Sequence, residues 1–206
     1  MKTLIIFFMV LLTVPAYGAM GNSVASYDPE RLPKWLQYSD DTAESYESPG
    51  THTYLVEFTM PTGYSFINKM RIFIHFERNY SGGGNIELRI YNAARKLVWW
   101  EKIEYEHLYR GTSCWRPYGV FKTFPYGTKI YVGASFWPGS AGPEAGPMLG
   151  VDTDPPQHDK YSWDRTWDGR WVQCSGTNRD FMVAIYITES VAVDPTSLGQ
   201  VKALYY

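Results

Sequence analysis

Apolar and polar side chains alternate with a period of two along several segments of this chain. In the segment KMRIFIHFE, the apolar residues Met70, Ile72, Ile74 and Phe76 fall on one face of an extended strand. A strand with one face in a core and the other in solvent produces this pattern. β-Branched and aromatic residues also gather in further segments that we expect to be strands, namely 54–59, 86–91, 97–105, 120–124, 129–137, 171–174 and 181–188.

Glycine and proline separate these segments and interrupt any long helix. The run SGGGN at 81–85 lies between two predicted strands, and we expect it to close a hairpin. The only helix candidates are short pieces near residues 29–36. We therefore predict an all-β fold, a single antiparallel β-sandwich domain over residues 36–190, with a jelly-roll-like or immunoglobulin-like topology.

Composition favours a folded protein and argues against a nucleic-acid partner. Of the 206 residues, 17% are aromatic and only 19% are charged, a content that supports a sizeable core. The 19 Lys and Arg residues against 21 Asp and Glu give a formal net charge of −2. The chain therefore lacks the positive field that attracts nucleic acids.

The first residues have the order of a secretory signal peptide. Lys2 is followed by the apolar run LIIFFMVLL at 4–12 and by the small residues Ala16, Gly18 and Ala19. The run is too short for a membrane span, which needs about 20 apolar residues. We expect residues 1–18 to be a cleaved signal peptide and residues 19–35 a lead-in to the domain. The mature chain, without a membrane span, is then secreted or extracytoplasmic, in a periplasm or at a cell surface.

The segment LQYSDDTAE at 36–44 is similar to the YDDGTAE opening of β-sandwich domains in secreted bacterial proteins. Strand-like segments follow in a similar order, among them MRIFIHF, ELRIYNAARKLVW and YVGASFW, so the resemblance spans residues 36–188. It implies a jelly-roll-like accessory domain, of a kind usually attached to larger secreted or cell-surface proteins. Residues 191–206 resemble the TxWGxIKALY junction of such proteins, and a solvated tail is the alternative.

Two cysteines remain in a chain that we expect to be exported. Oxidising compartments favour disulfides, so we predict a bond between Cys114 and Cys174. The alternative is two separate buried thiols, because pairing geometry does not follow from sequence.

Aromatic residues suggest a binding face. Trp163, Trp167 and Trp171 are spaced by four, with Tyr161 beside them, and Trp137 precedes a long Pro-Gly loop. Flat indoles on a loop or a sheet edge present rigid surface on which sugar rings or peptide side chains stack. In the alternative interpretation, these aromatic residues fill the ends of the core.

Acidic residues in turn-rich segments are candidates for a structural calcium site, the one cofactor that we consider. Calcium binds several carboxylate and carbonyl oxygens, and the loop VDTDPP offers Asp152 and Asp154. The spacing differs from that of an EF-hand, and turn formation and capping are the alternative roles. The other acids that we consider are Asp159, Asp164 and Asp168 near this loop, and Asp40, Asp41 and Glu44 in the opening segment.

Catalytic chemistry has weaker support. A jelly-roll glycosidase needs two converging carboxylates, for which Glu101, Glu104 and Glu106 are candidates beside Trp99, Trp100 and Tyr105. An exposed alternating face explains these glutamates better, because Glu104 and Glu106 would share one face of one strand and no glycosidase motif surrounds them. The histidines form no zinc motif, and Ser140 does not lie in a nucleophile elbow.

We therefore expect a secreted, non-catalytic β-sandwich module for binding, adhesion or assembly at a bacterial surface, with a glycan or a surface protein as partner. A small secreted jelly-roll glycoside hydrolase is the first alternative, and it requires two carboxylates in an aromatic cleft. A structural subunit of a surface complex is the second, and it requires an exposed apolar patch or an unprotected edge strand. The sequence leaves the ligand and the oligomeric state open.

Overall fold

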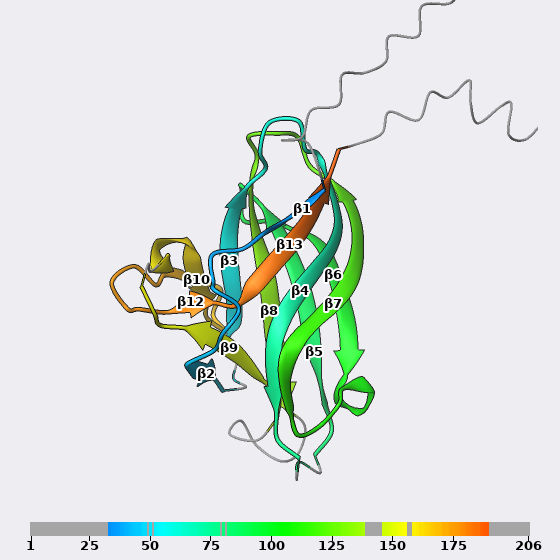
Figure 1. Cartoon of the computed structure of the whole chain (residues 1–206), viewed down its shortest axis with the longest axis vertical. Helices are drawn as coiled ribbons and strands as arrows, with labels where there is room; N and C mark the ends of the chain where they lie inside the picture. Colours follow the sequence, from blue (N-terminus) through cyan, green and yellow to red (C-terminus); the bar gives the residue numbers. More distant parts are fainter. Residues whose placement is uncertain are drawn as a thin grey trace, which may run out of the picture.

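Two antiparallel β-sheets pack face to face in the computed structural model, which describes residues 33–48, 50, 52–78, 80, 82–138, 146–155 and 158–189 (Figure 1). The predicted all-β sandwich is therefore confirmed. The predicted signal peptide (1–18) and the tail at 191–206 lie outside the described residues.

The six-stranded sheet has the order β11-β10-β3-β8-β5-β6, with every neighbouring pair antiparallel. Its strands are, in chain order, β3 (Thr53–Thr59), β5 (Gly84–Asn92), β6 (Leu97–Glu104), β8 (Lys129–Pro138), β10 (Ser162–Arg165) and β11 (Trp171–Gln173).

The seven-stranded sheet is built around its central strand, β4. One edge of β4 pairs with β7, and the other edge is shared by β13 and β9. Its strands are β1 (Lys34–Leu36), β2 (Ser45–Glu47), β4 (Phe66–Phe76), β7 (Thr112–Thr123), β9 (Met148–Asp152), β12 (Asp180–Phe181) and β13 (Val183–Thr188).

Helical structure in the described part of the chain is limited to the 3-10 turns η2 (Tyr105–His107) and η3 (Asp159–Tyr161). Within those ranges, no helix has the length and apolar character needed to cross a membrane.

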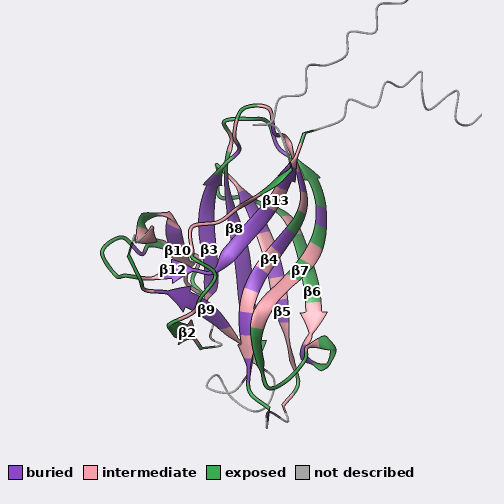
Figure 2. Cartoon of the chain, in the orientation of Figure 1, coloured by how far each residue is buried: buried purple, intermediate pink, exposed green. Residues whose placement is uncertain are grey.

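The core lies between the two sheets and follows the alternation in the sequence. Met70, Ile72, Ile74 and Phe76 of β4 are at most 2% exposed, as predicted. Opposing residues from the other sheet include Ile86, Leu88 and Ile90 of β5, which are fully buried. Figure 2 shows the buried residues running along the strands of both sheets. Burial of this apolar surface, at about 25 cal/mol per Å², is the main stabilising contribution.

Two local predictions are wrong. The strands before and after the SGGGN run do not form a hairpin, because β4 belongs to the seven-stranded sheet and β5 to the six-stranded sheet. Apolar faces on both strands let them bury one another across the core instead of pairing side by side. The short helix expected near 29–36 is also absent at its described end, where β1 pairs with β13 and Trp35 packs on Tyr186 at 5.2 Å between ring centroids.

The predicted disulfide between Cys114 and Cys174 is not formed, and both thiols are free. Cys114 lies on β7, which Figure 1 shows on the same side of the sandwich as β6 and away from β10. Cys174 is buried just after β11, which is the opposite edge of the six-stranded sheet from β6. That sheet is several strands wide at about 4.8 Å per strand, whereas a disulfide needs Cα atoms within about 7 Å.

We predict that the chain has two free thiols when no reducing agent has been added. In the native state at pH 8, iodoacetamide should modify Cys114 and spare Cys174, because burial raises the pKa of the Cys174 thiol to about 11. Intact-mass spectrometry should show one adduct in the folded protein and two in denaturant. A chain that takes up iodoacetamide in denaturant only after reduction would contradict the structure.

Candidate functional site

The outer face of the six-stranded sheet carries a cluster of large side chains that is separate from the core. Leu55 on β3, Tyr91 on β5 and Tyr131 on β8 point away from the seven-stranded sheet but are at most 5% exposed. Trp163 on β10 and Trp171 on β11 pack against them. We call these five residues the outer cluster. Protein side chains thus already fill part of this face.

The two tryptophans of the outer cluster are held in place by their neighbours. The ring centroids of Trp163 and Trp171 lie 5.7 and 5.0 Å from that of Tyr131, both in edge-to-face geometry. The Arg95 guanidinium lies 4.9 Å from the Trp163 ring and 5.1 Å from the Trp171 ring. Arg95 reaches them from the turn between β5 and β6, with a φ of 59°. These indoles are therefore half-buried packing elements, unlike the flat exposed platform of the binding hypothesis.

Two other predicted binding residues lie away from the outer cluster. Trp167 is 77% exposed in the turn that joins β10 to β11. Tyr161 ends η3, and its ring stacks on that of Tyr38 with the centroids 4.3 Å apart. Burial raises the pKa of the Tyr38 hydroxyl to about 12. The three tryptophans spaced by four thus lie on one short hairpin. The first and last indoles lie on its two strands, and the middle indole lies at its turn.

The fifth predicted binding residue, Trp137, lies on the outer face beside a polar group that our sequence analysis did not single out. Glu87 and Arg89 project outward from β5, and their side chains form an ion pair of 2.5 Å. The Nη1 atom of Arg89 also donates to Thr53 Oγ1 at 3.2 Å. Trp137 is 41% exposed, and its ring centroid lies 6.0 Å from the guanidinium.

A second exposed indole lies on the other side of Arg89. Trp100 on β6 is directly opposite Arg89 in the β5–β6 pair and is 56% exposed. We call Glu87, Arg89, Trp100 and Trp137 the Arg89 patch. The run LVWWEK contained the signal for Trp100, since alternation directs one of two adjacent tryptophans outward, while Trp99 packs against the core.

Gly133 on β8 separates the Arg89 patch from the outer cluster. It pairs with Leu55 on one side and with Arg89 on the other. A Cβ atom at this position would lie 1.9 Å from the carbonyl oxygen of Tyr54, so only glycine fits. No side chain from β8 therefore comes between Leu55 and Arg89.

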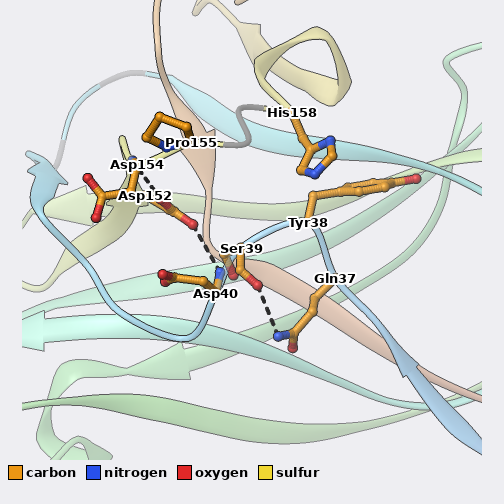
Figure 3. Close-up of a pocket in the computed structure, with 8 residues that line it drawn as sticks. All are labelled: Gln37, Tyr38, Ser39, Asp40, Asp152, Asp154, Pro155 and His158. Atoms are coloured by element: carbon orange, nitrogen blue, oxygen red, sulfur yellow. Dashed lines mark hydrogen bonds between the residues drawn. The ribbon is translucent and has the colours of Figure 1, made fainter.

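A second candidate site is a pocket of about 190 Å³ between the segment after β1 and the end of β9 (Figure 3). One oxygen of the Asp152 carboxylate accepts the backbone N–H of Asp40 at 3.0 Å, and the other accepts that of Asp154 at 2.9 Å. The rings of Tyr38 and His158 stand together on one side of the pocket (Figure 3). The pocket thus brings the opening segment of the chain against a loop more than 100 residues later.

Three carboxylates converge beside this pocket. One oxygen from each of Asp40, Glu44 and Asp152 lies within 4.8 Å of the others. Asp152 is only 4% exposed, and this burial raises its pKa. Hydrogen bonds from Thr42 lower the pKa values of Asp40 and Glu44. Of the two predicted calcium candidates in the VDTDPP loop, Asp152 lies at the centre of this cluster and Asp154 lines the pocket.

The other acids that we considered for calcium are engaged elsewhere. Each contacts a basic side chain or a backbone N–H outside the pocket. The contacts are Asp41 with Arg71 at 3.1 Å, Asp159 with Thr177 N at 3.0 Å, Asp164 with His52 at 2.8 Å and Asp168 with Arg170 at 2.6 Å.

The glutamates proposed for a glycosidase do not form a pair on one strand face. Glu101 and Glu104 lie on opposite faces of β6, and Glu106 lies in η2. Ser140 lies outside the described residues.

No protein-family model matches this sequence, and no curated protein is significantly similar to it. Of what the resemblance of residues 36–188 implies, the structure shows an all-β fold of two antiparallel sheets.

We predict that the tryptophans of the β10–β11 hairpin differ sharply in their contribution to stability. Trp171→Ala should lower the melting temperature by about 4–8 °C, because it removes a ring that packs on Tyr91 and Tyr131. Trp167→Ala should change it by less than about 2 °C, because that side chain is 77% exposed. Differential scanning calorimetry provides the comparison. Equal effects of the two substitutions would contradict the packing of the outer cluster.

Proposed function

We propose that this chain is a secreted, non-catalytic β-sandwich module that binds glycans at a bacterial surface through the Arg89 patch. The proposal rests on one arrangement, in which two exposed indoles flank a hydrogen-bonded Arg-Glu pair on a rigid sheet. Strands hold the side chains of a binding site in a more precise geometry than loops do.

The chemistry of the Arg89 patch suits a sugar ring. The apolar C–H face of a pyranose packs on an indole, and its hydroxyl groups accept from a guanidinium and donate to a carboxylate. Arg89 and Glu87 have side chains that are 15% and 24% exposed, so their partly buried ends are oriented before a ligand arrives. Contacts with Thr53 and Tyr91 at 3.2 and 3.3 Å fix the guanidinium further. Such pre-orientation reduces the entropy cost of binding.

The distribution of acids favours binding over hydrolysis. Glycoside hydrolysis by two carboxylates needs a pair about 5–9.5 Å apart that converges on the sugar, with one acid able to donate a proton. Three described carboxylates on the outer face are each engaged with a basic side chain. The pairs are Glu87 with Arg89 at 2.5 Å, Glu57 with Lys129 at 2.7 Å and Glu104 with Lys102 at 2.8 Å.

The sequence supports the cellular part of the proposal. The signal-peptide pattern at 1–18 indicates export, and the resemblance of residues 36–188 suggests a jelly-roll-like accessory domain of secreted bacterial proteins. In this proposal, the domain holds its own chain on a surface glycan.

We predict that the exposed indoles carry the binding. Fluorescently labelled full chain should retain specific glycans on an array, and Trp100→Ala and Trp137→Ala should each weaken binding of the best glycan at least about tenfold. Isothermal titration calorimetry with the soluble oligosaccharide measures the change. Trp167→Ala is the matched control, because it removes an exposed indole outside the Arg89 patch. The proposal fails if no glycan retains the wild-type chain or if all three variants bind alike.

A further inference from the structure

Three acidic side chains meet where the opening segment crosses the end of β9. Asp40 and Glu44 come from the segment between β1 and β2, and Asp152 is the last residue of β9. One oxygen from each lies within 4.8 Å of the others. Like charges this close repel one another, so the cluster needs a compensating charge.

No basic side chain supplies that charge within the described ranges. None of Asp40, Glu44 and Asp152 forms an ion pair there, whereas the neighbouring Asp41 is paired with Arg71 at 3.1 Å. The hydrogen bonds at the cluster come from Thr42 and from backbone N–H groups, among them that of Thr153 to Glu44 at 3.0 Å. These neutral donors orient the oxygens and leave lone pairs available.

A fourth acid, Asp180, is buried beside the cluster and provides a second, independent observation. Asp180 is directly opposite Asp152 in the β9–β12 pair, so both side chains project from the same face of the sheet, with Cβ atoms about 5 Å apart. The residue is 2% exposed, and its Oδ1 atom has no hydrogen-bond partner among the described residues. Its Oδ2 atom accepts the backbone N–H of His158, which lines the pocket in Figure 3. A buried carboxylate oxygen without a partner is costly unless a cation or a donor faces it.

From this geometry, we propose that the chain binds one Ca²⁺ ion between Asp40, Glu44 and Asp152, with Asp180 as the buried acid behind them. The donors are all carboxylate oxygens, which select hard cations over zinc or copper. Two oxygens bound to one Ca²⁺ ion at 2.3–2.6 Å are at most about 5 Å apart, but only about 4.2 Å apart around Mg²⁺. The cluster oxygens, which lie within 4.8 Å of one another, are therefore close enough together to share one Ca²⁺ ion.

The ion ties three distant stretches of the chain together. It bridges the opening segment to β9. Asp180, which lies on β12 and accepts the backbone N–H of His158, connects the site to β12 and to the loop at His158. Tyr38, two residues before Asp40, stacks on Tyr161 of η3 at 4.3 Å between ring centroids, and η3 leads directly into β10. The site is therefore a structural clamp for this edge of the sandwich, and it is independent of the glycan proposal.

The test uses the full chain stripped with EDTA. Addition of 10 mM CaCl₂ should raise the melting temperature by about 3–10 °C, as expected for a site with the submillimolar affinity of extracellular modules. Calorimetry should give one Ca²⁺ ion per chain, and 10 mM MgCl₂ should give a smaller thermal shift. An absent Ca²⁺ response overturns the site, and an equal or larger Mg²⁺ response overturns the assignment to calcium.

Two variants distinguish a cation site from a merely structural role of the acids. Glu44→Gln changes an exposed ligand and should weaken Ca²⁺ binding at least about tenfold. Asp180→Asn should leave the melting temperature in EDTA unchanged or higher, because it removes a buried charge, yet reduce the rise caused by calcium. Asp168→Asn, which changes an acid paired with Arg170, is the control and should keep the full response. A full calcium response in both Glu44→Gln and Asp180→Asn, or an equal loss in Asp168→Asn, overturns the proposal.

Discussion

Burial of alternate side chains between the two sheets is the constraint on which the rest of this structure depends. On β5, the inward residues Ile86, Leu88 and Ile90 are fully buried in the core. The pleat of the strand then directs the intervening residues Glu87 and Arg89 to the outer face. Packing therefore determines the geometry of this candidate site, because the same strands that build the core hold the polar and aromatic groups of the Arg89 patch in a fixed array.

The two candidate sites differ in how the fold builds them. The Arg89 patch is assembled from neighbouring strands of one sheet, so its residues are set by register. The acidic site is assembled where Asp40, Asp152 and Asp180 meet, and these residues lie more than 100 positions apart at the extremes. Local structure does not bring residues together that are so far apart in the sequence. A bound cation would offset the repulsion between its carboxylates and fasten the opening segment to the sheet.

Sequence patterns predicted local structure well and pairing poorly. The alternation of Met70, Ile72, Ile74 and Phe76 predicted both the strand and its buried face. The glycine run after this strand predicted a hairpin, but the strands before and after it belong to different sheets. Turn residues indicate that the chain changes direction, and they do not indicate which strands pair with one another. The same limit applies to Cys114 and Cys174. Export would favour a bond between them, but Cys114 lies on β7 of the seven-stranded sheet, whereas Cys174 follows β11 at an edge of the six-stranded sheet. The spacing of four grouped Trp163 and Trp171 with Trp167, but it did not predict their packing with Arg95, since that residue comes from a distant turn.

The sequence by itself determined the fold class, most of the longer strands and the buried face of β4, because a period of two is a local property of an extended chain. It also marked Trp137 and the acids Asp40, Glu44 and Asp152, but it did not single out Glu87, Arg89 or Asp180. The tertiary structure alone decided which of them meet: Trp100 and Trp137 around Arg89, and Asp40 with Glu44 and Asp152. Strand order and register are set by the summed burial and hydrogen bonding of the whole sandwich, and no single segment contains that information.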